Sequence, residues 1–124
     1  GSTFGGNPVA CAAGIAVLRE IVENGLMANA ASVGEYLKEQ LAGVAARFTR
    51  HVREVRGLGL MLGLELKVDG PSVTSGLLER GVLVNLTNSN VLRWIPPLIV
   101  DRAQAGQAVD AVVDVLAMIS AENE

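Results

Sequence analysis

The chain has 124 residues, half of them apolar and 3% aromatic, so its hydrophobic core must be built from aliphatic side chains. This length suits one ordinary domain, and the net charge of −3 argues against nucleic-acid binding, which needs a clustered basic face. The single cysteine excludes an internal disulfide framework and predicts a reducing compartment. Without a cleavable leader or an apolar run of about 20 residues, we expect a cytoplasmic protein and no membrane association.

The first eight residues, GSTFGGNP, combine two hydroxyl side chains, a glycine pair and a helix start. Ser2 and Thr3 carry the hydroxyls, and Asn7 followed by Pro8 is typical of a helix N-cap and first helical residue. Small residues let backbone N–H groups approach an anion, and the helix start adds positive partial charge. The stretch predicts either a phosphate or carboxylate clamp or a tight turn that only leads into the helix.

Residues 8–24 predict a helix that stops at Gly25 and has almost no polar face before Arg19. A helix that is apolar nearly all round must be covered nearly all round. The cover is either a surface outside this chain, from the rest of the protein or another subunit, or the other elements of the same domain. Cys11 lies within the apolar run and is expected to be a small buried residue.

Apolar residues three and four positions apart predict an amphipathic helix over residues 26–48. A basic run surrounds His51 after this helix, and because Glu54 interrupts it and no aromatic platform accompanies it, we interpret it as a solvated surface; its members are Arg47, Arg50, Arg53 and Arg56. His51 has no second His, Cys or acidic cluster at ligand spacing, so it predicts neither a metal site nor a catalytic group.

Leucines alternate with glycine, methionine or glutamate from Leu58 to Leu66, which predicts one strand with an apolar face and a nearly bare face. A bare face suggests close approach by another backbone. After a polar turn, Ser72 is expected to cap a short helix that ends near Arg80.

Two β-rich runs, residues 82–86 and 91–95, flank a turn composition at 87–90 and predict a hairpin. Two prolines then end the pairing, and Asp101 is expected to cap a last helix. The order helix, helix, strand, helix, strand, strand, helix predicts an α+β fold, in which a small, mostly antiparallel sheet is covered by helices and preceded by a long linking helix.

The opening GSTFGGNP, continued by VACAAGIAVLREI, resembles the segment just past the catalytic lysine of class III pyridoxal-phosphate aminotransferases, above all the acetylornithine aminotransferase group. Three later stretches match this family in the same order: VREVRGLGLMLGLEL at 52–66, GVLVN at 81–85 and VLRWIPPLIV at 91–100. The resemblance therefore covers nearly the whole chain, although the larger cofactor-binding part of such an enzyme is missing from it.

This resemblance implies that residues 1–25 are the cofactor-phosphate loop and linking helix, and residues 26–124 the small C-terminal domain. The parent enzyme would be a homodimer that uses pyridoxal phosphate to move an amino group from N-acetylornithine, or a similar ω-amino donor, to 2-oxoglutarate in arginine biosynthesis. Ornithine, succinylornithine, 4-aminobutyrate and diaminopelargonate-type transamination remain alternatives, as does a non-catalytic dimerisation module.

The resemblance also implies site residues. Thr3, with Ser2 beside it, would reach the cofactor phosphate held by the other subunit, and Arg93 would hold a substrate carboxylate. From the residues alone, Arg93 either points into a cleft or lies on an exposed edge; the resemblance favours the cleft. Neither Lys38 nor Lys67 matches the lysine motif of the family, so we expect this chain alone to be inactive.

The neighbours of Arg93 carry further expectations. Trp94 lies on the opposite face of the strand and is expected in the core. The polar residues before this strand line a cleft or serve as turn residues; they are Asn85, Thr87 and Asn88.

Overall fold

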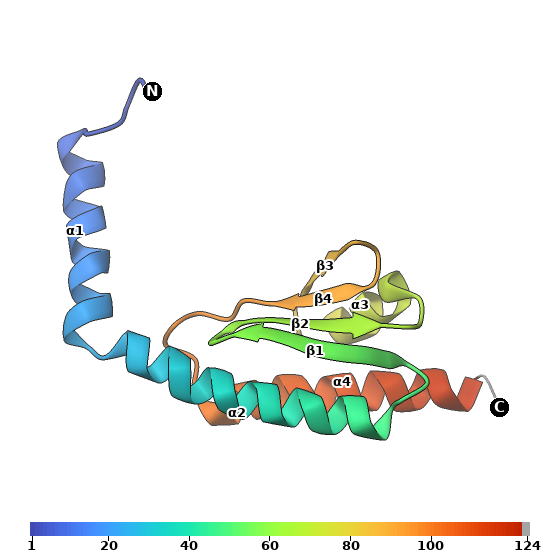
Figure 1. Ribbon diagram of the computed structural model, residues 1–124. Helices are drawn as coiled ribbons and strands as arrows, with labels where there is room; N and C mark the ends of the chain where they lie inside the picture. The colour runs from blue at the N-terminus through green and yellow to red at the C-terminus, as the bar shows by residue number, and fades with distance from the viewer. Residues whose placement is uncertain (123–124) are drawn as a thin grey trace.

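The computed structural model describes residues 1–122, which form four helices and four strands (Figure 1). In chain order these are α1 (Pro8–Glu23), α2 (Leu26–Arg47), β1 (Val52–Leu58), β2 (Met61–Leu66), α3 (Gly70–Glu79), β3 (Asn85–Thr87), β4 (Val91–Trp94) and α4 (Arg102–Glu122).

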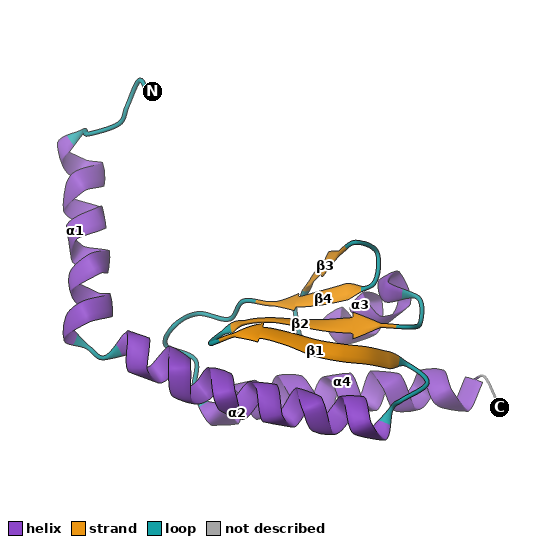
Figure 2. Cartoon of the chain, viewed as in Figure 1, coloured by secondary structure: helices purple, strands orange, loops and turns teal. Residues whose placement is uncertain are grey.

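The four strands form one antiparallel sheet in the order β1-β2-β4-β3 (Figure 2). Helices α2, α3 and α4 contribute to a single aliphatic core with one face of this sheet. Leu62, Leu64 and Leu66 of β2 and Leu92 of β4 point into this core and are fully buried. The α+β fold expected from the sequence is confirmed.

The single strand expected over residues 58–66 is wrong, because Gly59 and Leu60 form the turn of a β1–β2 hairpin. Gly57 and Gly59 both have positive φ angles, of 131° and 54°, which favour glycine. Leu58 therefore falls on the other side of the turn and is 87% exposed. Strand β1 lacks a clean alternation because it is an edge strand whose charged side chains face solvent.

The β3–β4 hairpin is confirmed, although β3 is shorter than the run 82–86. Asp69, rather than Ser72, caps α3: its Oδ2 accepts hydrogen bonds from the Ser72 backbone N–H at 3.0 Å and from the Ser72 hydroxyl at 2.6 Å. Asp101 caps α4 as expected, with Oδ1 2.8 Å from the Gln104 nitrogen. Trp94 is in the core and 6% exposed.

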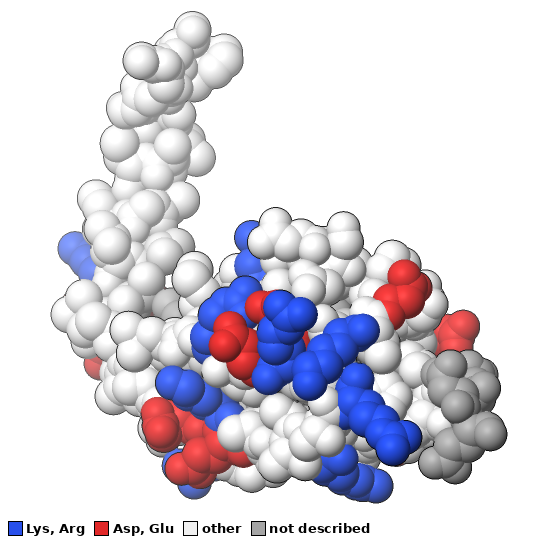
Figure 3. Space-filling model, turned by 45° about the vertical axis from the view of Figure 1, so that its right-hand side comes forward, with Lys and Arg blue, Asp and Glu red and all other residues white. Residues whose placement is uncertain are grey.

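Helix α1 extends away from the sheet and its covering helices (Figure 1). None of its residues is buried, and the sulfur-bearing side chain of Cys11 is exposed. The elements of this domain therefore do not wrap α1, and the expected burial of Cys11 is wrong within this chain. Figure 3 shows this arm with almost no charged side chains. None of the helices within residues 1–122 combines the length and the apolar character that crossing a membrane requires.

Candidate functional site

The loop before α1 presents exposed donors beside a helix N-terminus. Asn7 fixes the junction: its Oδ1 accepts from the Ala10 N–H at 2.9 Å, and its Nδ2 donates to the Phe4 carbonyl at 2.8 Å. Ser2 and Thr3 are exposed, and neither hydroxyl bonds to another described residue. These hydroxyls and the first turn of α1 are therefore available to an anion.

Arg93 lies on the face of the sheet that the helices leave uncovered, and it lines a groove of about 390 Å³. The groove runs between the segment before β3 and the two prolines that follow β4, with Ala108 of α4 also at its wall. Asn85 faces Arg93 across the β3–β4 pair. Arg93 is thus exposed and borders this groove, whose other lining residues are mostly apolar.

A transverse row crosses the uncovered face, because Arg56 of β1 faces Gly63 of β2, which in turn faces Arg93 of β4. Gly63 places no side chain of its own between the two arginines, and the Val91 side chain lies over this position, 3.2 Å from where a Cβ would be. Arg56 is held by carboxylates: its Nη1 donates to Glu65 at 2.6 Å and to Glu54. These hydrogen bonds, with that to Glu65 the largest cause, raise the pKa of Arg56.

The two arginines of this row thus differ in their partners. Glu65 also pairs with Arg53 at 3.0 Å, whereas Arg93 makes no ion pair with a described carboxylate. Arg93 is consequently the one that can accept a carboxylate ligand without breaking an existing pair. Sequence reasoning missed this row because it depends on strand register, and the turn at Gly59 shifted β1 out of the expected pattern.

The two lysines make structural hydrogen bonds. Lys38 Nζ donates to the Gly57 carbonyl at 3.3 Å, and Lys67 Nζ donates to the Thr49 carbonyl at 2.7 Å. Neither lysine lines the Arg93 groove or belongs to the loop before α1. Both lysines therefore lie away from the two parts of the candidate site, and each donates to a backbone carbonyl.

The structure does not bring the two parts of the candidate site together. Residues 1–7 lie at the far end of α1, while Arg93 lies in the sheet (Figure 1). A pocket containing both kinds of group would need a surface from outside these residues.

Comparison with known proteins gives consistent matches. The model of the family "Aminotransferase class-III" matches residues 1–116. Acetylornithine aminotransferase of Caldanaerobacter subterraneus is 43% identical over 95% of this chain. Acetylornithine aminotransferase 1 of Bordetella bronchiseptica is 42% identical over the whole chain. The chain spans only 30% and 31% of these two relatives.

Solved structures agree with the sequence relatives. A transaminase with L-Ala matches the whole chain with a TM-score of 0.90 and 31% identity, over 32% of its own length. The ornithine aminotransferase of Toxoplasma gondii, whose active site holds partially occupied PLP, matches 98% of the chain with a TM-score of 0.89 and 30% identity, over 30% of its own length. The chain belongs to the class III aminotransferase family.

Proposed function

We propose that this chain is the C-terminal part of a pyridoxal-phosphate-dependent aminotransferase. Residues 1–25 supply a cofactor-phosphate loop and linking helix, and residues 26–124 supply the small domain. The alignment of nearly the whole chain with about 30% of each relative supports a portion of a larger enzyme. The exposed apolar arm of α1 supports a cover from the rest of the enzyme or from a second subunit of a homodimer.

The proposed reaction moves an amino group from N-acetylornithine, or a similar ω-amino donor, to 2-oxoglutarate in arginine biosynthesis, in the cytoplasm. The observation that carries this choice is the 42–43% identity to proteins named acetylornithine aminotransferase over 95–100% of the chain. Ornithine is the second candidate donor, because an ornithine aminotransferase superposes with a TM-score of 0.89 at 30% identity.

Thr3, with Ser2 beside it, is proposed to donate hydrogen bonds to the cofactor phosphate of the other subunit. Pyridoxal phosphate supplies the electron sink that transamination requires when it is bound. A hydroxyl donor close to the N-terminus of α1 suits a phosphate, since the helix dipole and the donor act on the same anion. The lysine that attaches the cofactor is expected outside these residues.

Arg93 is proposed to hold a substrate carboxylate in the groove. A guanidinium presents paired N–H donors in one plane and binds a carboxylate through two parallel hydrogen bonds, which an ammonium group does not. Its neighbour Asn85 adds an amide at the same groove. Because Glu65 and Glu54 already engage Arg56, the assignment falls on Arg93.

The substitution Arg93→Lys in the complete enzyme tests this assignment. We expect kcat/KM for acetylornithine and 2-oxoglutarate to fall by about 10- to 100-fold, chiefly through a higher KM, because the bidentate pairing is lost. The matched control is Arg80→Lys, which makes the same substitution at the residue that follows α3, outside the groove, and should leave the kinetics unaltered. Equal kinetics for Arg93→Lys and the control would overturn the role of Arg93.

A second assay tests the substrate and the completeness of the chain. The complete enzyme is compared with acetylornithine, ornithine, succinylornithine and 4-aminobutyrate as donors, and acetylornithine should give the highest kcat/KM. The 124-residue chain alone should give no turnover with added cofactor. Turnover by this chain would overturn the proposed dependence on an external lysine. If the complete gene product instead forms a stable dimer that does not bind the cofactor, a dimerisation module is favoured.

A further inference from the structure

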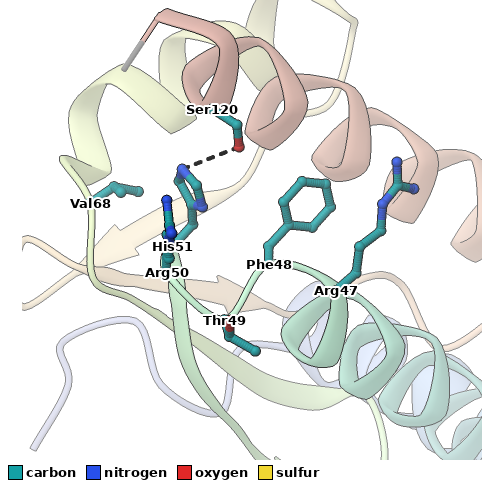
Figure 4. A pocket seen from close by; sticks show the side chains of 7 residues that line it. All are labelled: Arg47, Phe48, Thr49, Arg50, His51, Val68 and Ser120. Carbon is teal, nitrogen blue, oxygen red and sulfur yellow. Dashed lines mark hydrogen bonds between the residues drawn. The ribbon is translucent and has the colours of Figure 1, made fainter. Parts of the chain in front are cut away.

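A second hollow lies at the end of the domain opposite α1, between the end of α2, the loop into β1 and the last turns of α4 (Figure 4). Its volume is about 520 Å³. The end of the domain that carries it gathers Lys and Arg side chains (Figure 3). This hollow shares no residue with the Arg93 groove.

Cationic side chains lie on both sides of an apolar floor in this hollow. Phe48 forms the floor, and the guanidinium carbon of Arg47 lies 5.0 Å from the centre of its ring. This cation–π contact holds the Arg47 side chain over the hollow. Arg50 lines the other side, beside His51 (Figure 4). No lining residue is acidic, and neither arginine pairs with a described carboxylate.

The imidazole of His51 is oriented by two contacts. The Ser120 hydroxyl donates to the Leu116 carbonyl at 2.8 Å, so its oxygen is left to accept from His51 Nε2–H at 3.3 Å. The imidazole also meets the Phe48 ring edge-on, with ring centres 6.1 Å apart. Because the Ser120 hydroxyl proton and the His51 Nε2–H are both used within the protein, the hollow offers a ligand mainly the N–H groups of Arg47 and Arg50.

We propose that this hollow binds a phosphate group, either of free phosphate or of a phosphorylated small molecule. Two guanidinium groups line it, and their paired N–H donors suit a tetrahedral oxyanion with several acceptor oxygens. The site is independent of the proposed transamination, since it uses the opposite end of the sheet from Arg93.

The single histidine of the chain makes the experiment direct, because the C–H signals of its imidazole report this hollow alone. Inorganic phosphate is titrated into the 124-residue chain at constant pH and ionic strength, and NMR follows these signals. We expect a saturable shift in the millimolar range. Phenyl phosphate as a second probe separates the sources: tighter binding than inorganic phosphate indicates a phosphorylated small molecule, and equal binding indicates free phosphate.

The variants Arg47→Gln and Arg50→Gln should each weaken phosphate binding by about tenfold, since each removes a charge-assisted hydrogen bond. Arg19→Gln removes the same charge from exposed α1 and should leave the affinity unchanged. Amide chemical shifts verify that each variant is folded. The proposal is overturned if chloride or acetate at equal ionic strength produces the same shift, or if Arg47→Gln and Arg50→Gln bind phosphate as tightly as Arg19→Gln.

Discussion

Helices α1 and α2 follow one another in the chain and are both rich in apolar residues, yet their surroundings are opposite. Five residues of α2 are buried, and none of α1 is. Helix α2 gathers its apolar side chains on one face, which packs on β1, β2 and α4. Helix α1 distributes them nearly all round and, among the described residues, makes its main contacts with α2. An apolar pattern therefore predicts that a helix must be buried. It does not predict whether the burying surface comes from the same chain.

The largest expected effect contrasts a core leucine with a leucine of α1. Leu64 is fully buried, whereas Leu18 is 64% exposed. Leu64→Ala should lower the free energy of unfolding by about 2–5 kcal/mol, because it removes buried apolar groups and leaves a cavity. Leu18→Ala should change it by less than about 0.5 kcal/mol. Urea denaturation followed by circular dichroism measures both values.

Equal destabilisation by these two substitutions would contradict the contrast. It would mean that α1 packs on the domain in solution.

A second pair compares two helical glycines. A Cβ at Gly34 of α2 would lie 2.3 Å from the Gly59 backbone at the hairpin turn, whereas a Cβ at Gly14 of α1 would meet nothing within 4 Å. Gly34→Ala should therefore cost about 1–3 kcal/mol of unfolding free energy through overpacking. Gly14→Ala should instead favour α1 by about 0.5–1 kcal/mol and increase helicity without moving the main transition.

Thermal and urea unfolding of Gly34→Ala and Gly14→Ala measure these changes. If Gly34→Ala leaves the free energy of unfolding unchanged, the hairpin turn must move away from α2 without a cost in stability.

Elements with a clear period were predictable from the sequence, and those set by register were not. The three-and-four spacing predicted α2, the Asp101 cap predicted the start of α4, and the turn composition predicted the β3–β4 hairpin. The leucine alternation continues through Gly59 without a break. It therefore gave no sign of the turn, which depends on the positive φ of Gly59. Strand β1 was not predicted because an edge strand with one solvated face needs few apolar residues, so its sequence shows no clear alternation.

The candidate site divides in the same way. Ser2, Thr3 and Arg93 were identified through motifs that resemble a family, and the structure leaves all three exposed. The row from Arg56 through Gly63 to Arg93 was not predictable, since it brings together three strands. The hollow at His51 was not predictable either, because Ser120 lies 69 positions away from His51 in the sequence.

The caps of α1 and α3 differ in their dependence on pH. Hydrogen bonds from the hydroxyl and the backbone N–H of Ser72 lower the pKa of Asp69, so the folded state favours its carboxylate form. Its contribution to stability is present above the pKa of the unfolded chain, near pH 4, and is lost as pH falls through the lower folded value. Asn7, which caps α1, has no titrating group.

The substitution Asp69→Asn keeps a capping acceptor but removes this titration. The stability of the unaltered chain should exceed that of Asp69→Asn at pH 6, and the difference should shrink as pH falls from roughly 4 toward 2. Urea midpoints at several pH values measure it. A difference that grows on acidification would contradict the assigned direction of the Asp69 pKa shift.

The smallest expected change in stability comes from removing α1 altogether. Because no residue of α1 is buried, a chain that starts at Asn24 should keep the urea midpoint of the whole chain within experimental error. Its self-association in analytical ultracentrifugation should fall, since the exposed apolar side chains leave with the helix. A large loss of stability would show that α1 packs on the domain. Undiminished self-association would show that the surface responsible lies on residues 26–124 and not on α1. Retained stability with weaker association would establish that residues 26–124 fold independently and that the apolar surface of α1 serves contacts outside them.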